Sequence, residues 1–115
     1  MITLYGIPNC DTMKKARKWL DEHGIEYHFH NYKKDGAPEK KLRQWVKQLG
    51  WETLLNRRGT TWRKLDESLK NSIDEAAAVQ IMLDNPSIIK RPVLVDGKQL
   101  QVGFNPSDYA SLLTK

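Results

Sequence analysis

A strand, a helix and a second strand within the first 32 residues constrain this fold most. Residues 2–5 are β-branched, aromatic or apolar and lead into a turn cluster at 6–9, which is typical of a strand that ends in a loop. An amphipathic helix is expected next, followed by Gly24 as a stop and by an alternating strand at 26–32. The apolar stripe of that helix consists of Met13, Ala16 and Leu20. So short a helical crossover favours parallel pairing of the two strands and a right-handed connection.

The middle of the chain, about residues 37–86, is predicted to be a helical insertion. Pro38 suits a first helical turn, and apolar residues follow it at helical spacing, which indicates a helix facing a core. They are Leu42, Trp45, Val46 and Leu49. The sequence predicts loop and short helix over residues 51–72. Ser72 and Glu75 fit a capping box in front of a further helix.

The last part of the chain predicts a β-hairpin and a helix. Apolar residues at 93–95 and 100–102 flank an Asp-Gly pair at 96–97 and two more polar residues, so the hairpin turn has either two or four residues. Asn105 is suited to cap a final helix with Pro106 in its first turn. This order of elements predicts an α/β fold, with a mixed four-stranded sheet and helices on its faces.

The composition predicts one folded domain over residues 1–115. Hydrophobic residues make up 39% of the chain, enough to fold without disulfides or metal. The single cysteine cannot form an internal disulfide, which predicts a reducing, cytoplasmic setting. Basic residues behind the net charge of +5 are interleaved with fourteen acidic ones, so an anionic small substrate is expected rather than nucleic acid. No apolar run approaches the roughly 20 residues of a membrane helix, so no membrane association is expected.

Cys10 is the candidate reactive residue. It lies between a strand and a basic helix, where unpaired amide groups and the helix dipole favour the thiolate. Lys14 and Arg17 strengthen this effect, and Asp11 opposes it. A buried, inert thiol is the alternative, but polar neighbours on both sides favour a reactive one. Met13 occupies the second cysteine position of a Cys-x-x-Cys motif, so an outside thiol such as glutathione would have to complete a redox cycle.

Two further groups of residues are candidates for binding. Arg57 and Arg58 lie in a Gly- and Thr-containing loop where guanidinium groups could bind an oxyanion, although solvated surface arginines are the commoner outcome. Arg91 precedes Pro92 just before the third strand, which taken alone is an ordinary strand entry. Two histidines on the second strand lack a third ligand at metal spacing, so no metal site is expected.

Three motifs carry a resemblance to a known family. They are Gly6-Ile-Pro-Asn-Cys10-Asp-Thr, Ile88-Ile-Lys-Arg91-Pro92-Val and Gly103-Phe-Asn-Pro-Ser. With them, nearly the whole chain resembles the glutaredoxin-coupled arsenate reductase family and its Spx-like relatives. Residues 56–65 are similar to the bacterial YffB-like branch of that family.

The resemblance implies a thioredoxin-like fold with a helical insertion between its second and third strands. It also implies that Cys10 is the nucleophile and that Pro92, in the cis conformation, lies beside it at a glutathione site. The residues expected to bind substrate or an oxyanion are Asn9, Thr12, Arg58 and Arg91. Two family arginines are replaced by Asn56 and Asn105, and Arg58 or Arg57 would have to substitute for the first. Arsenate reduction is therefore expected to be weak or absent.

The resulting expectation is a monomeric, glutathione-dependent thiol oxidoreductase without a bound cofactor. Its Cys10 thiolate would attack a small oxyanion or a disulfide, and glutathione, with glutaredoxin as a possible partner, would resolve the adduct. The alternative is a non-enzymatic regulator that binds RNA polymerase, as the resemblance to Spx implies. Many of those regulators use a Cys-x-x-Cys switch, which Met13 removes here.

Overall fold

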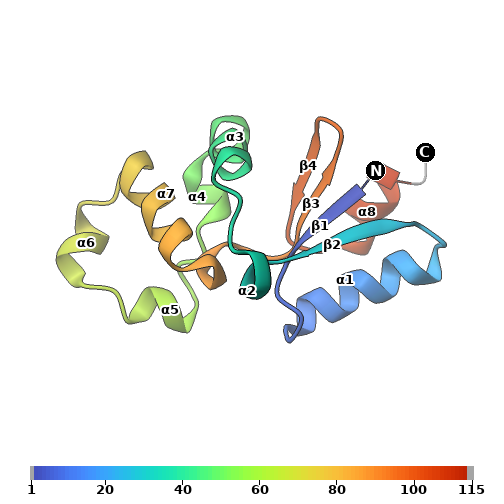
Figure 1. Cartoon of the computed structure of the whole chain (residues 1–115), viewed down its shortest axis with the longest axis horizontal. Helices are drawn as coiled ribbons and strands as arrows, with labels where there is room; N and C mark the ends of the chain where they lie inside the picture. Colours follow the sequence, from blue (N-terminus) through green and yellow to red (C-terminus); the bar gives the residue numbers. More distant parts are fainter. Residues whose placement is uncertain (1, 114–115) are drawn as a thin grey trace. The chain divides into compact units, whose positions relative to one another are not determined.

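A computed structural model of the chain describes residues 2–113 (Figure 1). The chain divides into two compact units. Unit 1 combines residues 2–31 with residues 91–113, and unit 2 consists of residues 32–90. The helical insertion predicted at about 37–86 falls inside unit 2, while the single-domain organisation stays a prediction.

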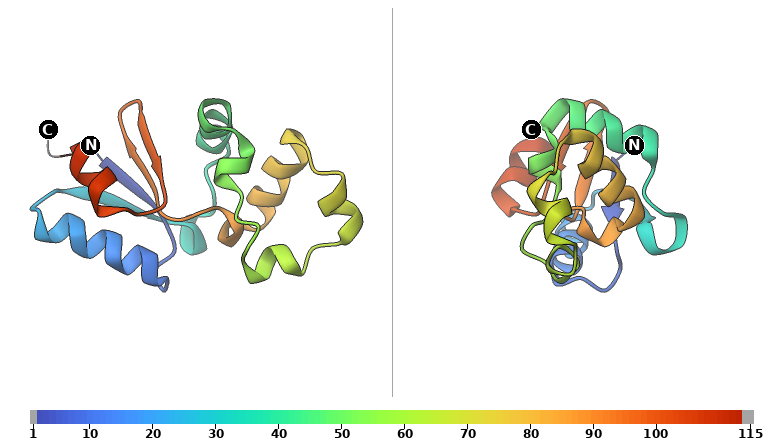
Figure 2. Two further views of the ribbon diagram at one scale, coloured as in Figure 1. Left: turned by 180° about the vertical axis from the view of Figure 1, so that it is seen from behind. Right: turned by 90° about the vertical axis from the view of Figure 1, so that its left-hand side faces the viewer.

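Unit 1 is a mixed four-stranded sheet with two helices, as Figures 1 and 2 show. Its elements are β1 (Ile2–Gly6), α1 (Asp11–Glu22), β2 (Tyr27–Asn31), β3 (Val93–Asp96), β4 (Gln99–Val102) and α8 (Pro106–Leu113). The strand order is β2-β1-β3-β4. The predicted parallel pairing of β1 with β2 is confirmed, and the other two pairings are antiparallel. This is the expected thioredoxin-like arrangement.

One face of the sheet forms the core of unit 1. Leu4 and Leu94 are partners in neighbouring strands, so their side chains share a face, and both are fully buried. They pack with the apolar stripe of α1 and with Tyr109 of α8. The stripe residues Met13, Ala16 and Leu20 are also fully buried, which confirms the predicted periodicity. This packing holds α1, and therefore the loop that leads into it, against the sheet.

Gly6 ends β1 where the strand and α1 approach each other closely. A Cβ atom at this position would overlap the thioether of Met13 and lie 2.8 Å from its Cε atom. A glycine here lets the first turn of α1 pack directly against the end of β1. The Cys10 loop starts from that contact.

Unit 2 is helical. It contains α2 (Tyr32–Asp35), α3 (Glu39–Leu49), α4 (Trp51–Leu54), α5 (Thr60–Arg63), α6 (Glu67–Asn71), α7 (Glu75–Asp84) and the 3-10 helix η1 (Pro86–Ile88). The predicted stripe of α3 is confirmed at Leu42, Trp45 and Val46, which are buried. Within residues 2–113, no helix has both the length and the apolar character needed to span a bilayer.

The structure corrects two local predictions and decides a third that the sequence left open. Tyr32 does not extend β2, because it begins α2. The predicted capping box is wrong: Asp74 caps α7 by accepting a hydrogen bond from the Ala77 amide at 2.9 Å, while the Ser72 hydroxyl donates to the Ser68 carbonyl. A carboxylate is favoured over a hydroxyl at that position because it also meets the positive end of the helix dipole. The β3–β4 turn has two residues, 97–98.

Tyr109 generates a stability prediction. It is fully buried, and its hydroxyl has no hydrogen-bond partner among the described residues. Its ring meets Phe104 and Trp19 edge-on, with centroid distances of 4.9 and 5.6 Å. Tyr109→Phe should keep these ring contacts, remove the unsatisfied hydroxyl and raise the free energy of unfolding by about 1 kcal/mol. Urea unfolding followed by circular dichroism measures the change.

The matched control is Tyr109→Ala, which removes the ring and should lower the free energy of unfolding by about 3 kcal/mol or more. A phenylalanine variant less stable than the wild type would contradict this account of the buried hydroxyl.

Candidate active site

Cys10 lies at the N-terminus of α1. It is the N-cap residue, with an extended backbone (φ −124°, ψ 132°), and its side chain is half-buried. Its carbonyl oxygen accepts the first hydrogen bond of the helix, from the Lys14 amide at 2.9 Å. The amide groups of the first turn have no carbonyl partner within the helix, so they remain free to act on the thiol.

Arg91 contacts Cys10 although 81 positions separate them in the sequence. Its Nε atom donates a hydrogen bond to the Cys10 Sγ atom at 3.4 Å. The peptide bond between Arg91 and Pro92 is cis, as the resemblance implies. Pro92 is buried, and its carbonyl oxygen accepts a hydrogen bond from the Gly103 amide at 2.8 Å. The segment that carries Arg91 is thereby tied to the residue that follows β4.

Opposing effects set the pKa of the Cys10 thiol. Partial burial raises the pKa, because it disfavours the charged thiolate. The Met13 amide, the Arg91 guanidinium and the Thr12 amide lower it, and together they outweigh burial. The pKa of Cys10 therefore lies below its ordinary value, even though its side chain makes no capping hydrogen bond to the helix. A thiolate is the nucleophilic form of cysteine, so the lowered pKa increases the fraction of Cys10 that can attack an electrophile at a given pH.

Asn9 and Thr12, which were expected to bind substrate next to the thiol, differ in their exposure. Asn9 is exposed just before Cys10, and Thr12 is half-buried in the first turn of α1. The side chain of Met13 is fully buried under the end of β1, at the position where a resolving cysteine would stand. The binding roles of Asn9 and Thr12 stay predictions.

Asn56 and Asn105, which the resemblance places at arginine positions of the reductases, both accept hydrogen bonds from nearby backbone. Asn105 caps α8, because its Oδ1 atom accepts from the amides of Ser107 and Asp108 at 2.8 and 3.3 Å. Asn56, in unit 2, accepts from the Arg58 amide at 3.0 Å. These side chains shape local turns.

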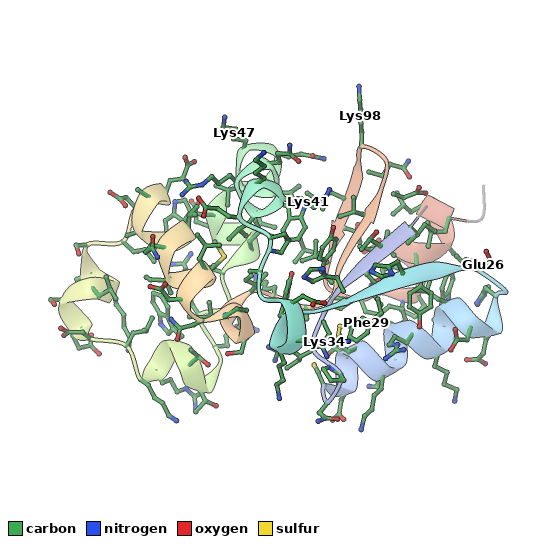
Figure 3. The ribbon with its side chains drawn as sticks, viewed as in Figure 1. Glu26, Phe29, Lys34, Lys41, Lys47 and Lys98 are labelled. Atoms are coloured by element: carbon green, nitrogen blue, oxygen red, sulfur yellow. The ribbon has the colours of Figure 1, made fainter. Side chains whose placement is uncertain are left out.

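Arg58 belongs to unit 2, where it lines a pocket with Arg57 and Lys90. Its predicted role in binding an oxyanion with Cys10 stays a prediction. Other basic side chains project from separate elements: Figure 3 shows Lys34 on α2, Lys47 on α3 and Lys98 at the hairpin turn. Among residues 2–113, no three His, Cys, Asp or Glu side chains form a group that could hold a metal ion.

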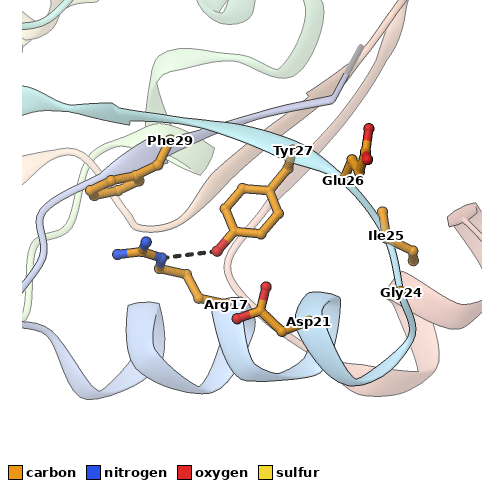
Figure 4. A pocket seen from close by; sticks show the side chains of 7 residues that line it. All are labelled: Arg17, Asp21, Gly24, Ile25, Glu26, Tyr27 and Phe29. Carbon is orange, nitrogen blue, oxygen red and sulfur yellow. Dashed lines mark hydrogen bonds between the residues drawn. The ribbon is translucent and has the colours of Figure 1, made fainter.

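The structure gives Arg17 a role that the sequence did not reveal. Its Nε atom donates to the Tyr27 hydroxyl at 3.0 Å, and its guanidinium lies 4.5 Å from the centre of the Phe29 ring (Figure 4). These contacts line an open groove of about 660 Å³ between α1 and β2. The positive charge of Arg17 was expected to act near Cys10, but its guanidinium is directed toward β2 instead. Helical periodicity cannot show which strand residue a helix side chain meets.

Comparison with known proteins identifies relatives over almost the whole chain. A family model described as the ArsC family matches residues 5–112. An uncharacterised protein of Haemophilus influenzae is 52% identical over 110 residues, which cover 95% of this chain and 96% of that protein. The global transcriptional regulator Spx of Staphylococcus aureus is 31% identical over 117 residues, covering 100% of this chain and 88% of the regulator.

Solved structures of similar proteins also match almost the whole chain. A YFFB protein is 56% identical and superposes with a TM-score of 0.95, covering 98% of this chain and 99% of its own. An arsenate reductase (ArsC) related protein from Brucella melitensis is 53% identical, with a TM-score of 0.78 and coverage of 96% of this chain and 92% of its own.

The contact between Arg91 and Cys10 generates a prediction about reactivity. Arg91→Ala should raise the pKa of Cys10 toward its ordinary value, because it removes a hydrogen bond and a positive charge that stabilise the thiolate. The alkylation rate of Cys10, followed by intact mass across a range of pH, should reach its midpoint at higher pH in this variant.

Lys18→Ala is the matched control, since it removes an exposed charge of the same sign from α1. Equal displacement of the two alkylation profiles would show that general surface charge, and not the Arg91 contact, sets the pKa of Cys10.

Proposed function

The chain belongs to the ArsC family, and we propose that it is a glutathione-dependent thiol oxidoreductase with Cys10 as its nucleophile. The observation that supports this most is the hydrogen bond from Arg91 to the Cys10 sulfur at a helix N-terminus. Together with the first-turn amides, it holds the pKa of the thiol below its ordinary value. A cysteine kept only for packing would gain nothing from such a setting.

The proposed cycle consists of two thiol–disulfide exchanges. In the first, the Cys10 thiolate attacks the glutathione sulfur of a mixed disulfide. A bond forms between Cys10 and glutathione, the original disulfide bond breaks, and the leaving thiolate takes the electron pair and then a proton from water. In the second, the thiolate of free glutathione attacks the glutathione sulfur of the adduct. Glutathione disulfide forms, and Cys10 leaves as the thiolate.

Arg91 stabilises negative charge on the Cys10 sulfur in both exchanges. Its positively charged guanidinium directs Nε at Sγ. Negative charge is present on this sulfur before the first attack and returns to it when the adduct is resolved. Stabilising that charge makes Cys10 a better leaving group in the second step.

Because the sequence has a single cysteine, the proposed cycle requires an external reductant. The sequence has one cysteine, and the position where a resolving thiol would stand holds the fully buried Met13. An adduct on Cys10 therefore has no internal thiol to displace it. Glutathione, the substrate that the resemblance implies for this family, would supply the second thiol.

Disulfides are proposed as better substrates than arsenate. The resemblance places arginines at positions 56 and 105 in the reductases, whereas here both hold asparagines that accept hydrogen bonds from local backbone. A charged hydrogen-bonding partner is worth about 1.5–3 kcal/mol, so losing one weakens binding of an oxyanion about tenfold or more. The reacting sulfur of a disulfide carries no charged oxygens, so its binding does not need those two arginines.

Formation of a glutathione adduct tests the proposal. Incubation with oxidised glutathione should add one glutathione to the wild-type protein, and reduced glutathione should remove it; intact mass follows both steps. Cys10→Ser should remain unmodified. The Arg91→Lys variant should form the adduct more slowly, because an ammonium group cannot reproduce the fixed geometry of Nε. A wild-type Cys10 that stays unmodified under these conditions would rule out the cycle.

A direct comparison of substrates tests the proposed preference. The ratio kcat/KM for a glutathionylated peptide should exceed that for arsenate by about tenfold or more, since one charged partner is missing from the oxyanion site. Oxidation of glutathione in a coupled assay measures both reactions. A higher value for arsenate would contradict the proposed preference while leaving the role of Cys10 intact.

A second candidate function is non-enzymatic regulation of transcription, with RNA polymerase as the bound partner. The 31% identity to the regulator Spx over the whole chain favours it. Met13 weighs against a Cys-x-x-Cys switch of the kind that the resemblance implies for many such regulators. Retention of RNA polymerase by the immobilised protein, combined with an unreactive Cys10, would establish this function in place of the enzyme.

A further inference from the structure

A pocket of about 340 Å³ lies entirely within unit 2. Its lining consists of Glu52, Leu55, Asn56, Arg57, Arg58 and Lys90. This volume is at the lower end of the range for small-molecule sites. Cys10 and Arg91 are not among the residues that line it.

A short β-bridge adjoins the pocket through Leu55. Leu55 and Ile89 pair across it in antiparallel fashion, and both are essentially buried. Beside the bridge, the Asn56 amide donates to the Ile88 carbonyl at 2.8 Å and the Lys90 amide donates to the Leu54 carbonyl at 2.7 Å. The backbone that carries Asn56 and Lys90 at the pocket is therefore held by two hydrogen bonds beside the bridge.

Contacts within unit 2 hold the backbone of Arg58 and the side chain of Arg57. The Asn56 side chain accepts from the Arg58 amide at 3.0 Å and so closes the turn that carries both arginines. The Arg57 guanidinium carbon lies 5.3 Å from the centre of the Trp51 ring, at the distance of a cation–π contact. Within residues 2–113, Arg57, Arg58 and Lys90 form no ion pair with a carboxylate.

The lining offers almost exclusively hydrogen-bond donors. Guanidinium and ammonium groups cannot accept, and the Asn56 carbonyl oxygen is already occupied, which leaves its amide nitrogen to donate. Glu52 provides the sole carboxylate of the lining, against three positive charges. The pocket therefore carries a net positive charge and suits an anion with several oxygen acceptors.

We propose that this pocket binds the phosphate group of a small phosphate monoester. A dianionic phosphate has three oxygens that can each accept from a guanidinium fork or an ammonium group, and it balances the net charge of the lining. The pocket is larger than a bare phosphate ion, which leaves room for the organic part of a monoester next to Leu55.

Titration of the ¹⁵N-labelled full chain tests the site without any thiol reagent. Phenyl phosphate and inorganic phosphate are added separately at constant ionic strength, and the amide resonances of Asn56, Arg58 and Lys90 are followed. Saturable shifts are expected with phenyl phosphate, with tighter binding at pH 8 than at pH 5.5, because the monoester becomes a dianion above a pKa of about 6.

Substitutions then locate the binding. Arg58→Gln should weaken phenyl phosphate binding by about threefold to tenfold through loss of a charged donor, and Glu52→Gln should strengthen it by removing a repulsive charge. Arg63→Gln is the matched control, because Arg63 is an exposed arginine of α5 outside the pocket. The same spectra show that each variant is folded.

Three results would overturn the proposal: shifts that do not saturate, equal weakening by Arg58→Gln and Arg63→Gln, or binding of inorganic phosphate without binding of phenyl phosphate. The last would identify a site for free phosphate alone. Formation of the Cys10 adduct is measured separately, so the phosphate site and the thiol cycle can each fail without the other.

Discussion

Antiparallel pairing of β1 with β3 is the constraint on which the candidate site depends. In this register Tyr5, near the end of β1, is the partner of Val93, at the start of β3. The loop that leaves β1 and the segment that enters β3 therefore lie at the same edge of the sheet. Cys10 belongs to the first and Arg91 to the second, so the pairing brings them within hydrogen-bond distance.

The chemistry at Cys10 reflects a balance between burial and polar contacts. A half-buried thiol loses hydration, which alone would make it harder to ionise. Two backbone amides of the first helical turn and the Arg91 guanidinium, which donates to the sulfur, reverse that effect. Backbone amides at a helix N-terminus are fixed by the helix itself, so their contribution needs no side chain that could rotate away. The close packing of Met13 against Gly6 holds that helix end in place.

Local patterns in the sequence predicted most of unit 1. Periodicity identified α1 with its buried stripe, and turn and cap residues identified the β3–β4 hairpin and α8. Where two local signals competed, as at the start of α7, the sequence favoured Ser72 although Asp74 is the cap. Sequence periodicity could not predict contacts between residues that lie far apart in the chain. Family resemblance alone pointed Arg91 toward Cys10, and nothing indicated the Leu55–Ile89 bridge that shapes the pocket of unit 2.

The two-residue turn between β3 and β4 limits how the length of this chain can vary. Because Val93 faces Val102 across the hairpin, the next residues on each strand bring the Pro92 carbonyl to the Gly103 amide. One extra residue in the turn would shift that register and turn the side chains of β4 to the opposite face of the sheet. This exposed surface turn, far along the chain from the cysteine, is thus expected to accept exchange of Lys98 but not insertion or deletion, and Gly97 is expected to stay glycine because its φ is 60°.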